Sequence, residues 1–239
     1  GDGALDLYVT NTFPHLSKLY RNQGDGTFED ASALDPALLG RMGKSLVGVL
    51  ARLHDLDVDA VGLGDFARRE GYIERQLKRW RAQFEQSATR DIPQVLEVHE
   101  RLATRVPEQQ GVGIVHGDYR LGNMLTGSGR ILAVLDWENA TVGDPLMDLG
   151  YLLAGWSDDD PDLPKRAEAV ARWSERSGRQ PEALGWYAAM STFKLACMLE
   201  GVYVRQSEDP TREASEFIAQ LVLDLIARAR RLADAGDDW

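Results

Sequence analysis

The sequence predicts an α+β domain that is mostly helical and is built around one small β-hairpin. Three observations lead to this prediction. Apolar residues recur at helical spacing over residues 35–55, two short apolar strands flank a Gly-Ser-Gly turn at 127–129, and helical patterns resume at Pro145 and continue to about residue 235.

The first thirty residues differ from the rest of the chain. Residues 4–10 alternate apolar and polar side chains, which predicts a strand, and residues 17–22 could form a second one. Residues 22–28 are rich in Gly and Asp, which tolerate the positive φ of a tight turn. No helical period is visible here.

The first predicted helix begins at Asp35-Pro36, because Asp is a favourable N-cap and Pro fits the first helical position. Two further helices are predicted over 72–86 and 93–104. His54 ends the first helix, where we expect a helix-dipole contact or exposure to solvent rather than catalysis.

The middle of the chain is predicted to be β-rich, with strands over 113–116, 123–125 and 131–135. Four helices should follow, over 145–154, 164–177, 181–205 and 211–235. We expect a central core built from the helices at 35–55, 72–86 and 181–205, with Cys197 as a buried apolar residue in the last of them.

Composition excludes several classes of partner. The formal net charge of −11 argues against nucleic acid or an anionic membrane as the main partner. No run reaches the roughly 18 apolar residues of a membrane span, and the opening GDGALDLYVT does not read as a signal peptide. The single cysteine excludes an intrachain disulfide and fits a reducing compartment. We therefore expect a cytoplasmic protein.

Three motifs carry residues suited to phosphoryl transfer: VHGDYRLGN at 115–123, LDWE at 135–138 and GDPLMDL at 143–149. Such a site needs a carboxylate that orients and deprotonates a hydroxyl, oxygen ligands for Mg²⁺, and a cation near the phosphate. Asp118 and Asn123 have the five-residue separation of the Asp and Asn in a kinase catalytic loop. Asp136 directly follows an apolar strand and could complete a metal site.

These motifs resemble the aminoglycoside phosphotransferase-type (phosphotransferase enzyme) family, most closely its branch associated with acyl-CoA dehydrogenases. LARLHDLDVDAVGLGDF, YIERQLKRW and FKLACMLEGVYVR extend the similarity, which covers about 33–235. The resemblance implies a protein-kinase-like C-terminal lobe. It also implies ATP as co-substrate, Mg²⁺ as cofactor and a small hydroxylated molecule as acceptor.

The resemblance also implies roles for individual residues. Asp118 would be the catalytic base, and Arg120 would touch the transferring phosphate. Asn123 and Asp136 would bind Mg²⁺. His116 would be structural and brace the loop by hydrogen bonds.

Three acidic residues have less defined roles. Glu138 stands where kinases carry Gly and could lie beside the metal. Asp144 precedes Pro145 at a helix start, so it is either a site residue or a helix cap. Asp148 is expected to hold the catalytic loop rather than to contact substrate.

The segment before residue 35 lacks the glycine-rich loop and the strand lysine of a kinase N-terminal lobe. We therefore expect that lobe to be largely absent and replaced by a short β segment. Residues 1–32 resemble a single FG-GAP/VCBS repeat, with Asp2, Gly3 and Asp6 as the remnant of its calcium loop. One such repeat cannot bury its faces alone. The predicted domains are thus residues 1–32 and 33–239.

Three functions follow as hypotheses. The first is an ATP-dependent phosphotransferase acting on a hydroxyl of a small molecule. The second is a catalytically incomplete kinase-like lobe with weak or no ATP binding, so that enzymatic activity stays open at this point. The third is a binding module in which the N-terminal segment binds calcium or a partner. For the phosphotransferase hypothesis, aminoglycoside, choline-like and hydroxyacyl-CoA acceptors are all compatible with the sequence. The family resemblance favours a hydroxyacyl-CoA acceptor.

Overall fold

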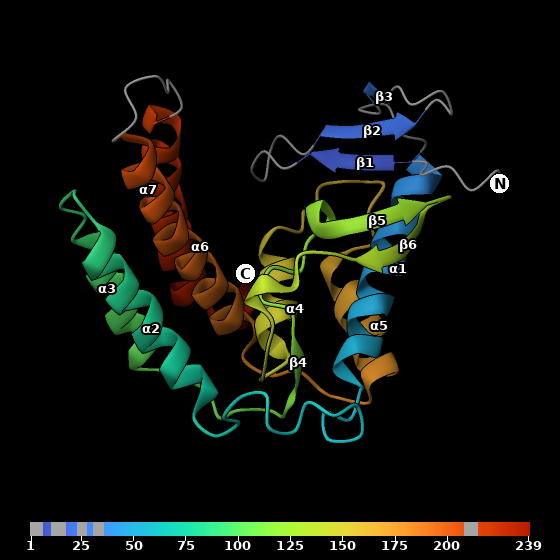
Figure 1. Ribbon diagram of the computed structural model, residues 1–239, viewed down its shortest axis with the longest axis horizontal. Coiled ribbons are helices and arrows are strands. Elements are labelled where there is room, and N and C mark those ends of the chain that lie inside the picture. The colour runs from blue at the N-terminus through green and yellow to red at the C-terminus, as the bar shows by residue number, and fades with distance from the viewer. Residues whose placement is uncertain (1–6, 11–17, 23–27, 31–35, 208–214) are drawn as a thin grey trace. The chain divides into compact units, whose positions relative to one another are not determined.

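The computed structural model describes residues 7–10, 18–22, 28–30, 36–207 and 215–239 (Figure 1). It divides into two compact units, each assembled from three stretches of the chain. The first unit comprises Gly1–Phe66, Gly113–Val142 and Gly155–Pro181. The second comprises Ala67–Val112, Gly143–Ala154 and Glu182–Trp239.

The first unit contains a five-stranded sheet in the order β3-β2-β1-β5-β6. The hydrogen-bonded neighbours run antiparallel. The strands are β1 (Leu7–Thr10), β2 (Lys18–Asn22), β3 (Phe28–Asp30), β5 (Met124–Gly127) and β6 (Arg130–Val134). The strand predicted within residues 4–10 and the possible second strand within residues 17–22 are thus confirmed in their described parts. The calcium-loop residues Asp2, Gly3 and Asp6 lie outside the described residues.

The β5–β6 hairpin has the tight turn that the sequence predicts. Ser128 and Gly129 have φ values of 50° and 75°, and two successive positive φ values are typical of a type I′ turn, whose twist matches the flanking strands. The turn packs closely on α1 (Pro36–His54), because a Cβ on Gly129 would lie 2.9 Å from Cδ1 of Leu38. The Ile131 N–H also donates to the Ser45 hydroxyl at 3.0 Å.

Two helices of the first unit, α1 and α5 (Arg166–Ser177), pack against each other. Trp173 of α5 is fully buried and donates its indole N–H to Nδ1 of His54 at 3.0 Å. His54 is itself fully buried, so the expected alternative of solvent exposure is wrong, while its place in the last turn of α1 agrees with the expected helix-dipole contact. A partner 119 positions away supplies the polar contact, and local sequence carries no signal of it.

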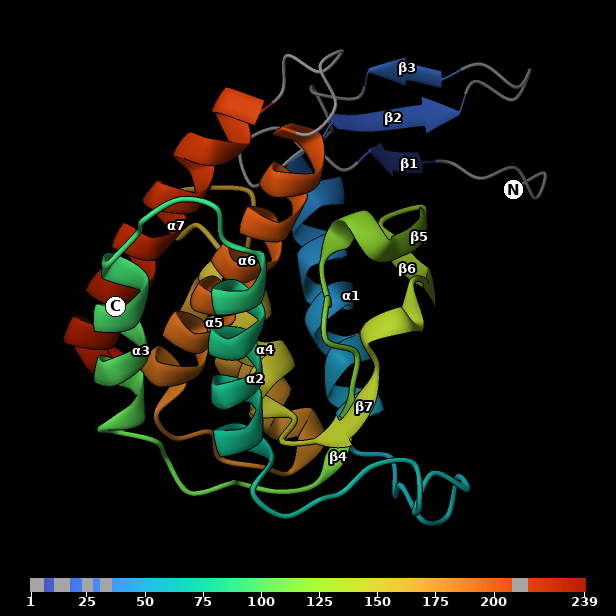
Figure 2. The same ribbon diagram turned by 60° about the vertical axis from the view of Figure 1, so that its left-hand side comes forward.

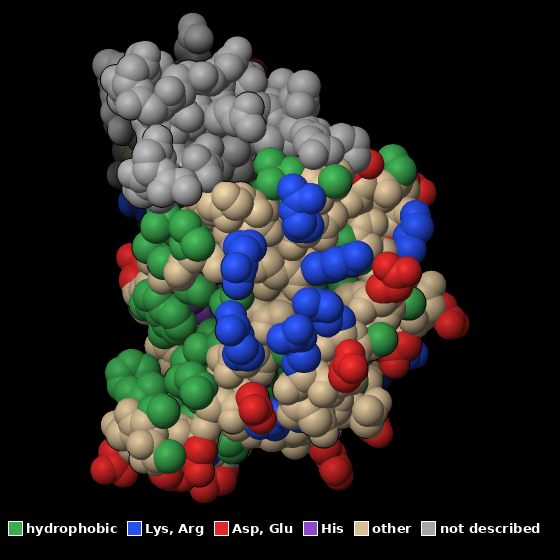
Figure 3. Space-filling model, turned by 90° about the vertical axis from the view of Figure 1, so that its right-hand side faces the viewer, with side chains coloured by type: hydrophobic (Ala, Val, Ile, Leu, Met, Phe, Trp, Pro, Cys, Tyr) green, Lys and Arg blue, Asp and Glu red, His purple; other side chains and the backbone are tan. Residues whose placement is uncertain are grey.

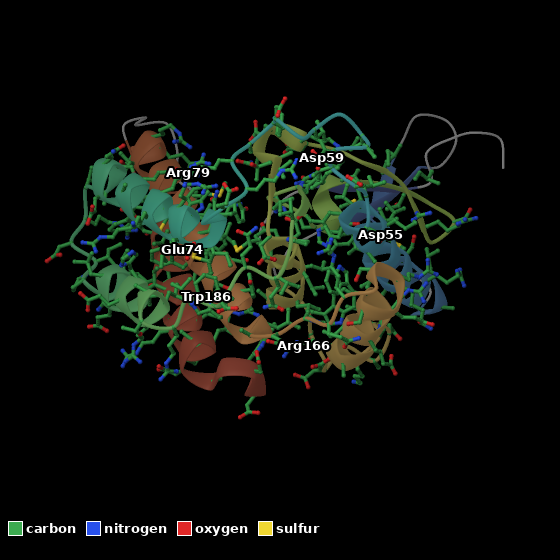
Figure 4. The ribbon with its side chains drawn as sticks, turned by 90° about the horizontal axis from the view of Figure 1, so that it is seen from below. Asp55, Asp59, Glu74, Arg79, Arg166 and Trp186 are labelled. Carbon is green, nitrogen blue, oxygen red and sulfur yellow. The ribbon has the colours of Figure 1, made fainter. Side chains whose placement is uncertain are left out.

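The second unit is helical in the part of the chain that the structure describes (Figure 2). α6 is central, since it contacts α2, α3, α4 and α7 and buries side chains around its circumference. Trp186 of α6, labelled in Figure 4, donates its indole N–H to the Leu102 carbonyl at 3.0 Å. The helices are α2 (Tyr72–Ser87), α3 (Gln94–Ala103), α4 (Leu146–Ala154), α6 (Leu184–Ser207), α7 (Ser215–Ala235) and the short η3 (Gly236–Asp238).

A buried ion pair ties the loop after α2 to α6 and α7. The Arg90 guanidinium donates to both carboxylate oxygens of Glu200, which is fully buried. It also donates to the Ala219 carbonyl at 3.3 Å and lies over the Tyr203 ring at 4.2 Å from its centroid. The hydrogen bonds to Glu200 raise the pKa of Arg90. The Glu200 charge is therefore neutralised inside the helical core.

Four short elements complete the path between the helices: β4 (Gly113–Val115), η1 (Leu121–Asn123), η2 (Trp137–Asn139) and β7 (Thr141–Gly143). β4 pairs with β7, a strand that the sequence analysis did not predict. The predicted helices are present within a few residues of their expected bounds, although Asp35 lies outside the described residues.

The expected single core is divided in the structure. α1 belongs to the first unit and packs mainly with α5, whereas α2 and α6 belong to the second unit and pack together. Cys197 is fully buried in α6, as predicted, and burial raises the pKa of its thiol. None of the described helices is long and apolar enough to cross a membrane.

Candidate active site

A short loop between β4 and β5 carries four of the predicted residues: His116, Asp118, Arg120 and Asn123. It turns sharply at Gly117, whose φ is +84°. A Cβ at Gly117 would lie 2.6 Å from the carbonyl oxygen of Asn139, closer than side chains approach backbone. Glycine is therefore required here for two reasons, its backbone conformation and the lack of space.

Asp118 is the centre of a polar cluster within this loop. Nδ2 of Asn123 donates to the Asp118 carboxylate at 2.8 Å and to the Asp118 carbonyl at 2.9 Å. Nε of Arg120 lies 3.1 Å from one carboxylate oxygen and 3.2 Å from the other. The Asp118 side chain is 16% exposed and that of Arg120 is 34% exposed. The cluster thus presents one edge to solvent while its geometry is fixed by three side chains.

These contacts leave specific atoms available. Among the residues that the structure describes, Oδ1 of Asn123 accepts no hydrogen bond, since both hydrogen bonds of its side chain are donated by Nδ2. Within the same residues, the two Nη atoms of Arg120 donate none. An acceptor oxygen and two guanidinium donors therefore remain for a ligand.

His116 is fully buried and is held at both ring nitrogens. The Asp118 N–H donates to Nδ1 at 3.2 Å, so Nδ1 is the unprotonated nitrogen, and Nε2 donates to the Leu135 carbonyl at 2.8 Å. This tautomer is assigned from the hydrogen bonds. The ring also packs against Trp137 at 4.8 Å and against Tyr119 at 5.9 Å between centroids.

Asp136 is connected to this loop through the backbone of Leu135. The Leu135 N–H donates to the Asn123 carbonyl at 2.8 Å, and the Leu135 carbonyl accepts from His116. Asp136 has φ 64° and ψ 62°, a left-handed conformation that is uncommon outside glycine. Strained residues of this kind cluster at functional sites. Its side chain is exposed, as is that of Glu138 two residues later.

Tyr119 is a site residue that the sequence analysis missed. It is fully buried, and its hydroxyl donates to the Leu46 carbonyl of α1 at 2.9 Å. This bond anchors the loop to the first helix across 73 residues. The sequence signal was weak, because an aromatic residue inside a polar motif is compatible with either burial or ligand contact.

Asp144 and Asp148 belong to the second unit. Asp144 is fully buried and accepts from the Leu146 N–H at 3.0 Å, as a helix cap does. It also accepts from the Gln110 N–H and from the Tyr187 hydroxyl, both at 2.8 Å. The cap predicted as one alternative for Asp144 is thus confirmed.

Asp148 is fully buried in the first turn of α4. Burial and the negative charges of Asp148 and Asp144 raise the pKa of Tyr72. Burial, together with the charge and hydrogen bond of Asp144, does the same for Tyr187. Both phenols are therefore neutral across the physiological range.

The structure thus joins Asp118, Arg120 and Asn123 directly and ties His116 and Asp136 to them through Leu135. Within the described residues, no hydrogen bond or ion pair joins the exposed Glu138 to this cluster. No group of three His, Cys, Asp or Glu side chains in the described ranges is arranged to hold a metal ion. A metal here would rely on a mixed Asn and Asp donor set.

Residues 16–187 match the phosphotransferase enzyme family. Acyl-CoA dehydrogenase family member 10 of Mus musculus is 32% identical over 205 residues, which cover 78% of this chain and 19% of the mouse protein. The chain thus spans about a fifth of that relative's length. The family match begins at residue 16, inside the segment 1–32 that the sequence predicts as a separate β fragment. The predicted domain boundary at residue 32 and the FG-GAP resemblance of this segment stay predictions.

Solved structures show the same fold. A candidate aminoglycoside phosphotransferase from Ralstonia eutropha has a TM-score of 0.70 and 30% identity, over 84% of this chain and 65% of that one. An aminoglycoside phosphotransferase crystallised with AMP-PNP and hygromycin B has a TM-score of 0.56 and 17% identity, over 85% of this chain and 67% of that one. The predicted α+β fold, related to the kinase-like phosphotransferases and largely helical, is confirmed.

Proposed function

The chain belongs to the phosphotransferase enzyme family, and we propose that it transfers the terminal phosphoryl group of ATP to a hydroxyl of a small molecule. The observation that supports this most is the hydrogen-bonded trio of Asp118, Arg120 and Asn123. Its residue types are those a phosphoryl transfer site needs: a carboxylate, a guanidinium and an oxygen ligand.

In this proposal Asp118 accepts the proton of the attacking hydroxyl. The Asp118 side chain is 16% exposed, so a hydroxyl can reach its carboxylate from solvent. The bonds to Arg120 and Asn123 fix the rotamer of the carboxylate, which orients the hydroxyl towards the phosphorus. Orientation of this kind is the main contribution of a protein to phosphoryl transfer.

Asn123 and Asp136 would hold Mg²⁺. They fit this ion because both offer oxygen, the donor that Mg²⁺ prefers. The Nδ2 bonds of Asn123 turn its Oδ1 away from Asp118, and the exposed Asp136 carboxylate lies close in the chain to the Leu135 bridge. When bound, Mg²⁺ would neutralise charge on the phosphate oxygens.

The remaining residues support this arrangement. Arg120 would bind the transferring phosphate through its Nη atoms while Nε stays on Asp118. His116 would brace the loop, since it holds the Asp118 N–H and the Leu135 carbonyl. Glu138 would lie beside the metal ligands. Asp144 would cap α4, and Asp148 would hold the catalytic loop.

The acceptor is proposed as a class, a small hydroxylated molecule. One similar structure was crystallised with hygromycin B, and relatives are named acyl-CoA dehydrogenases. Because the more similar sequences are of the second kind, we favour a hydroxyacyl-CoA acceptor over aminoglycoside or choline-like acceptors.

Isothermal titration with ATP tests the nucleotide site. We expect binding that requires Mg²⁺, that is lost in Asp136→Ala and that is unchanged in Asp159→Ala, which removes an exposed carboxylate of the same unit. Absence of Mg²⁺-dependent binding in the unmodified protein would refute the proposal. Equal behaviour of the two variants would refute the role of Asp136.

The same titration distinguishes the proposed phosphotransferase from the second hypothesis, a catalytically incomplete lobe that binds ATP weakly or not at all. If binding is present, Asp118→Asn tests the base. It should keep Mg²⁺-dependent binding, because the amide preserves the shape of the side chain. It should lose ADP formation when a panel of hydroxylated acceptors is supplied. An unchanged rate of ADP formation would count against Asp118 as the base.

A further inference from the structure

A stripe of basic side chains runs along one face of the first unit (Figure 3). α1 contributes Arg41, Lys44 and Arg52, and α5 contributes Arg172 and Arg176. We call these five residues the basic stripe. Positions 41, 44, 48 and 52 recur at helical spacing, so they lie on the same face of α1. Position 48 is glycine.

Gly48 lets the two helices share this face. A Cβ there would lie 3.7 Å from Nε of Arg172 and 3.8 Å from Cζ of Arg176, so both guanidinium groups lie over the glycine. Arg172 Nε donates to the Lys44 carbonyl of α1 at 2.9 Å. This bond immobilises the Arg172 guanidinium beside Lys44, and the residue remains partly exposed. Part of the stripe is therefore ordered before any partner binds.

Contacts within the protein account for only part of the stripe. Arg52 and Arg176 lie in the last turns of their helices, where cations are favourable. Arg41 and Lys44 lie in the first half of α1, where the helix dipole does not stabilise a positive side chain. Within the described residues, none of the five forms an ion pair with a carboxylate. Yet the chain as a whole carries 38 acidic against 27 basic residues.

The arrangement of the charges indicates the kind of ligand. The stripe extends over about 16 Å, since Arg52 lies eleven helical steps of about 1.5 Å beyond Arg41. Cations that bind one phosphate converge on a point, whereas these are spread at intervals and match a series of single charges. A long polyanion or a membrane would extend past the stripe and meet the repulsion of a chain with net charge −11.

We propose that the basic stripe docks an acidic polypeptide segment whose carboxylates are spaced along its length. The carboxylates pair with the anchored Arg172 and with its neighbours on α1. This function is separate from phosphoryl transfer, because the stripe contains none of the residues assigned to the active site.

Fluorescence anisotropy of the full chain tests the proposal. The probe is a fluorescein-labelled peptide of about twelve residues, the length that matches the stripe as a helix, with Glu at every fourth position. Its Gln counterpart is the neutral control. The stripe variant is Arg41→Glu with Lys44→Glu, and the charge-matched control is Lys78→Glu with Arg231→Glu, two exposed residues of the second unit. Circular dichroism verifies that each variant is folded, and Lys44→Glu with Arg52→Glu serves as a second stripe variant.

We expect the Glu peptide to bind at low salt and the Gln peptide not to bind. The stripe variants should weaken binding about tenfold or more, with less than about a threefold change in the control. No binding of the Glu peptide, or equal weakening in stripe and control variants, would overturn the proposal. Tighter stripe-dependent binding of single-stranded DNA, or of vesicles containing phosphatidylserine, would overturn the assignment of a polypeptide partner.

Discussion

Substitution of Gly117 by Ala tests how closely the loop that carries Asp118 is packed. Gly117 has φ +84° and a Cβ there would lie 2.6 Å from the Asn139 carbonyl oxygen. Gly62 is a matched control in the same unit, because its φ is +78° but nothing lies within 4 Å of its Cβ position. Both variants force alanine into a positive-φ conformation, and only Gly117→Ala adds a steric clash, with the Asn139 carbonyl oxygen.

The magnitudes follow from these two effects. A left-handed conformation costs a non-glycine residue about 1–2 kcal/mol, offset by about 0.4–1 kcal/mol because Ala restricts the unfolded chain. Gly62→Ala should therefore lower the free energy of unfolding by about 1 kcal/mol. Overpacking adds about 1–3 kcal/mol at Gly117. Urea denaturation of both variants measures the difference, and a loss at Gly117 no larger than at Gly62 would refute the steric argument.

Further predictions concern the second unit and the loop anchor. Tyr187→Phe removes a donor from the buried Asp144 carboxylate and should lower the free energy of unfolding by about 1.5–3 kcal/mol, whereas Tyr119→Phe loses a bond to a neutral carbonyl and should cost about 0.5–1.5 kcal/mol. Equal losses in urea denaturation would contradict this order. Glu200→Gln breaks a buried ion pair and should cost about 3–5 kcal/mol, while Glu85→Gln, at an exposed pair, should cost less than about 1 kcal/mol. If the two variants lose the same free energy of unfolding in urea denaturation, the buried ion pair does not stabilise the fold more than the exposed one. Burial and Asp144 raise the pKa of Tyr187, so the free energy of unfolding should fall as pH rises above the ordinary phenol pKa of about 10. Denaturation measured across alkaline pH should show a shallower fall in Tyr187→Phe, and an identical slope would oppose the assignment.

The parts of the fold that local pattern determines were predictable. The helix bounds followed from apolar periodicity, and the Ser128-Gly129 turn followed from residue types that tolerate positive φ. The burial of His54 was not predicted because its polar partner is Trp173, a residue distant in sequence. The division of the core was missed for the same reason, since periodicity shows which face of a helix is apolar but not which helix covers it.

The candidate site shows the same limit. Motif spacing indicated that Asp118 and Asn123 belong to one short loop, and the structure joins them there by a hydrogen bond. It gave no information on the direction of the Asn123 amide or on the pairing of Arg120 with Asp118. Tyr119 was missed because its partner is a backbone carbonyl of α1, and a main-chain acceptor has no signature in a sequence. The left-handed backbone conformation of Asp136 could not be predicted from the sequence either.

The bridge at Leu135 has a consequence for how this site tolerates sequence change. Both of its contacts are made by the main chain, and its side chain is 46% exposed. A library of substitutions at this position should therefore accept polar, charged and apolar residues alike. Proline alone would be rejected, because it has no N–H to give to Asn123. A position that an alignment would show as variable can thus hold two functional segments together, and its importance would appear only when the amide itself is removed.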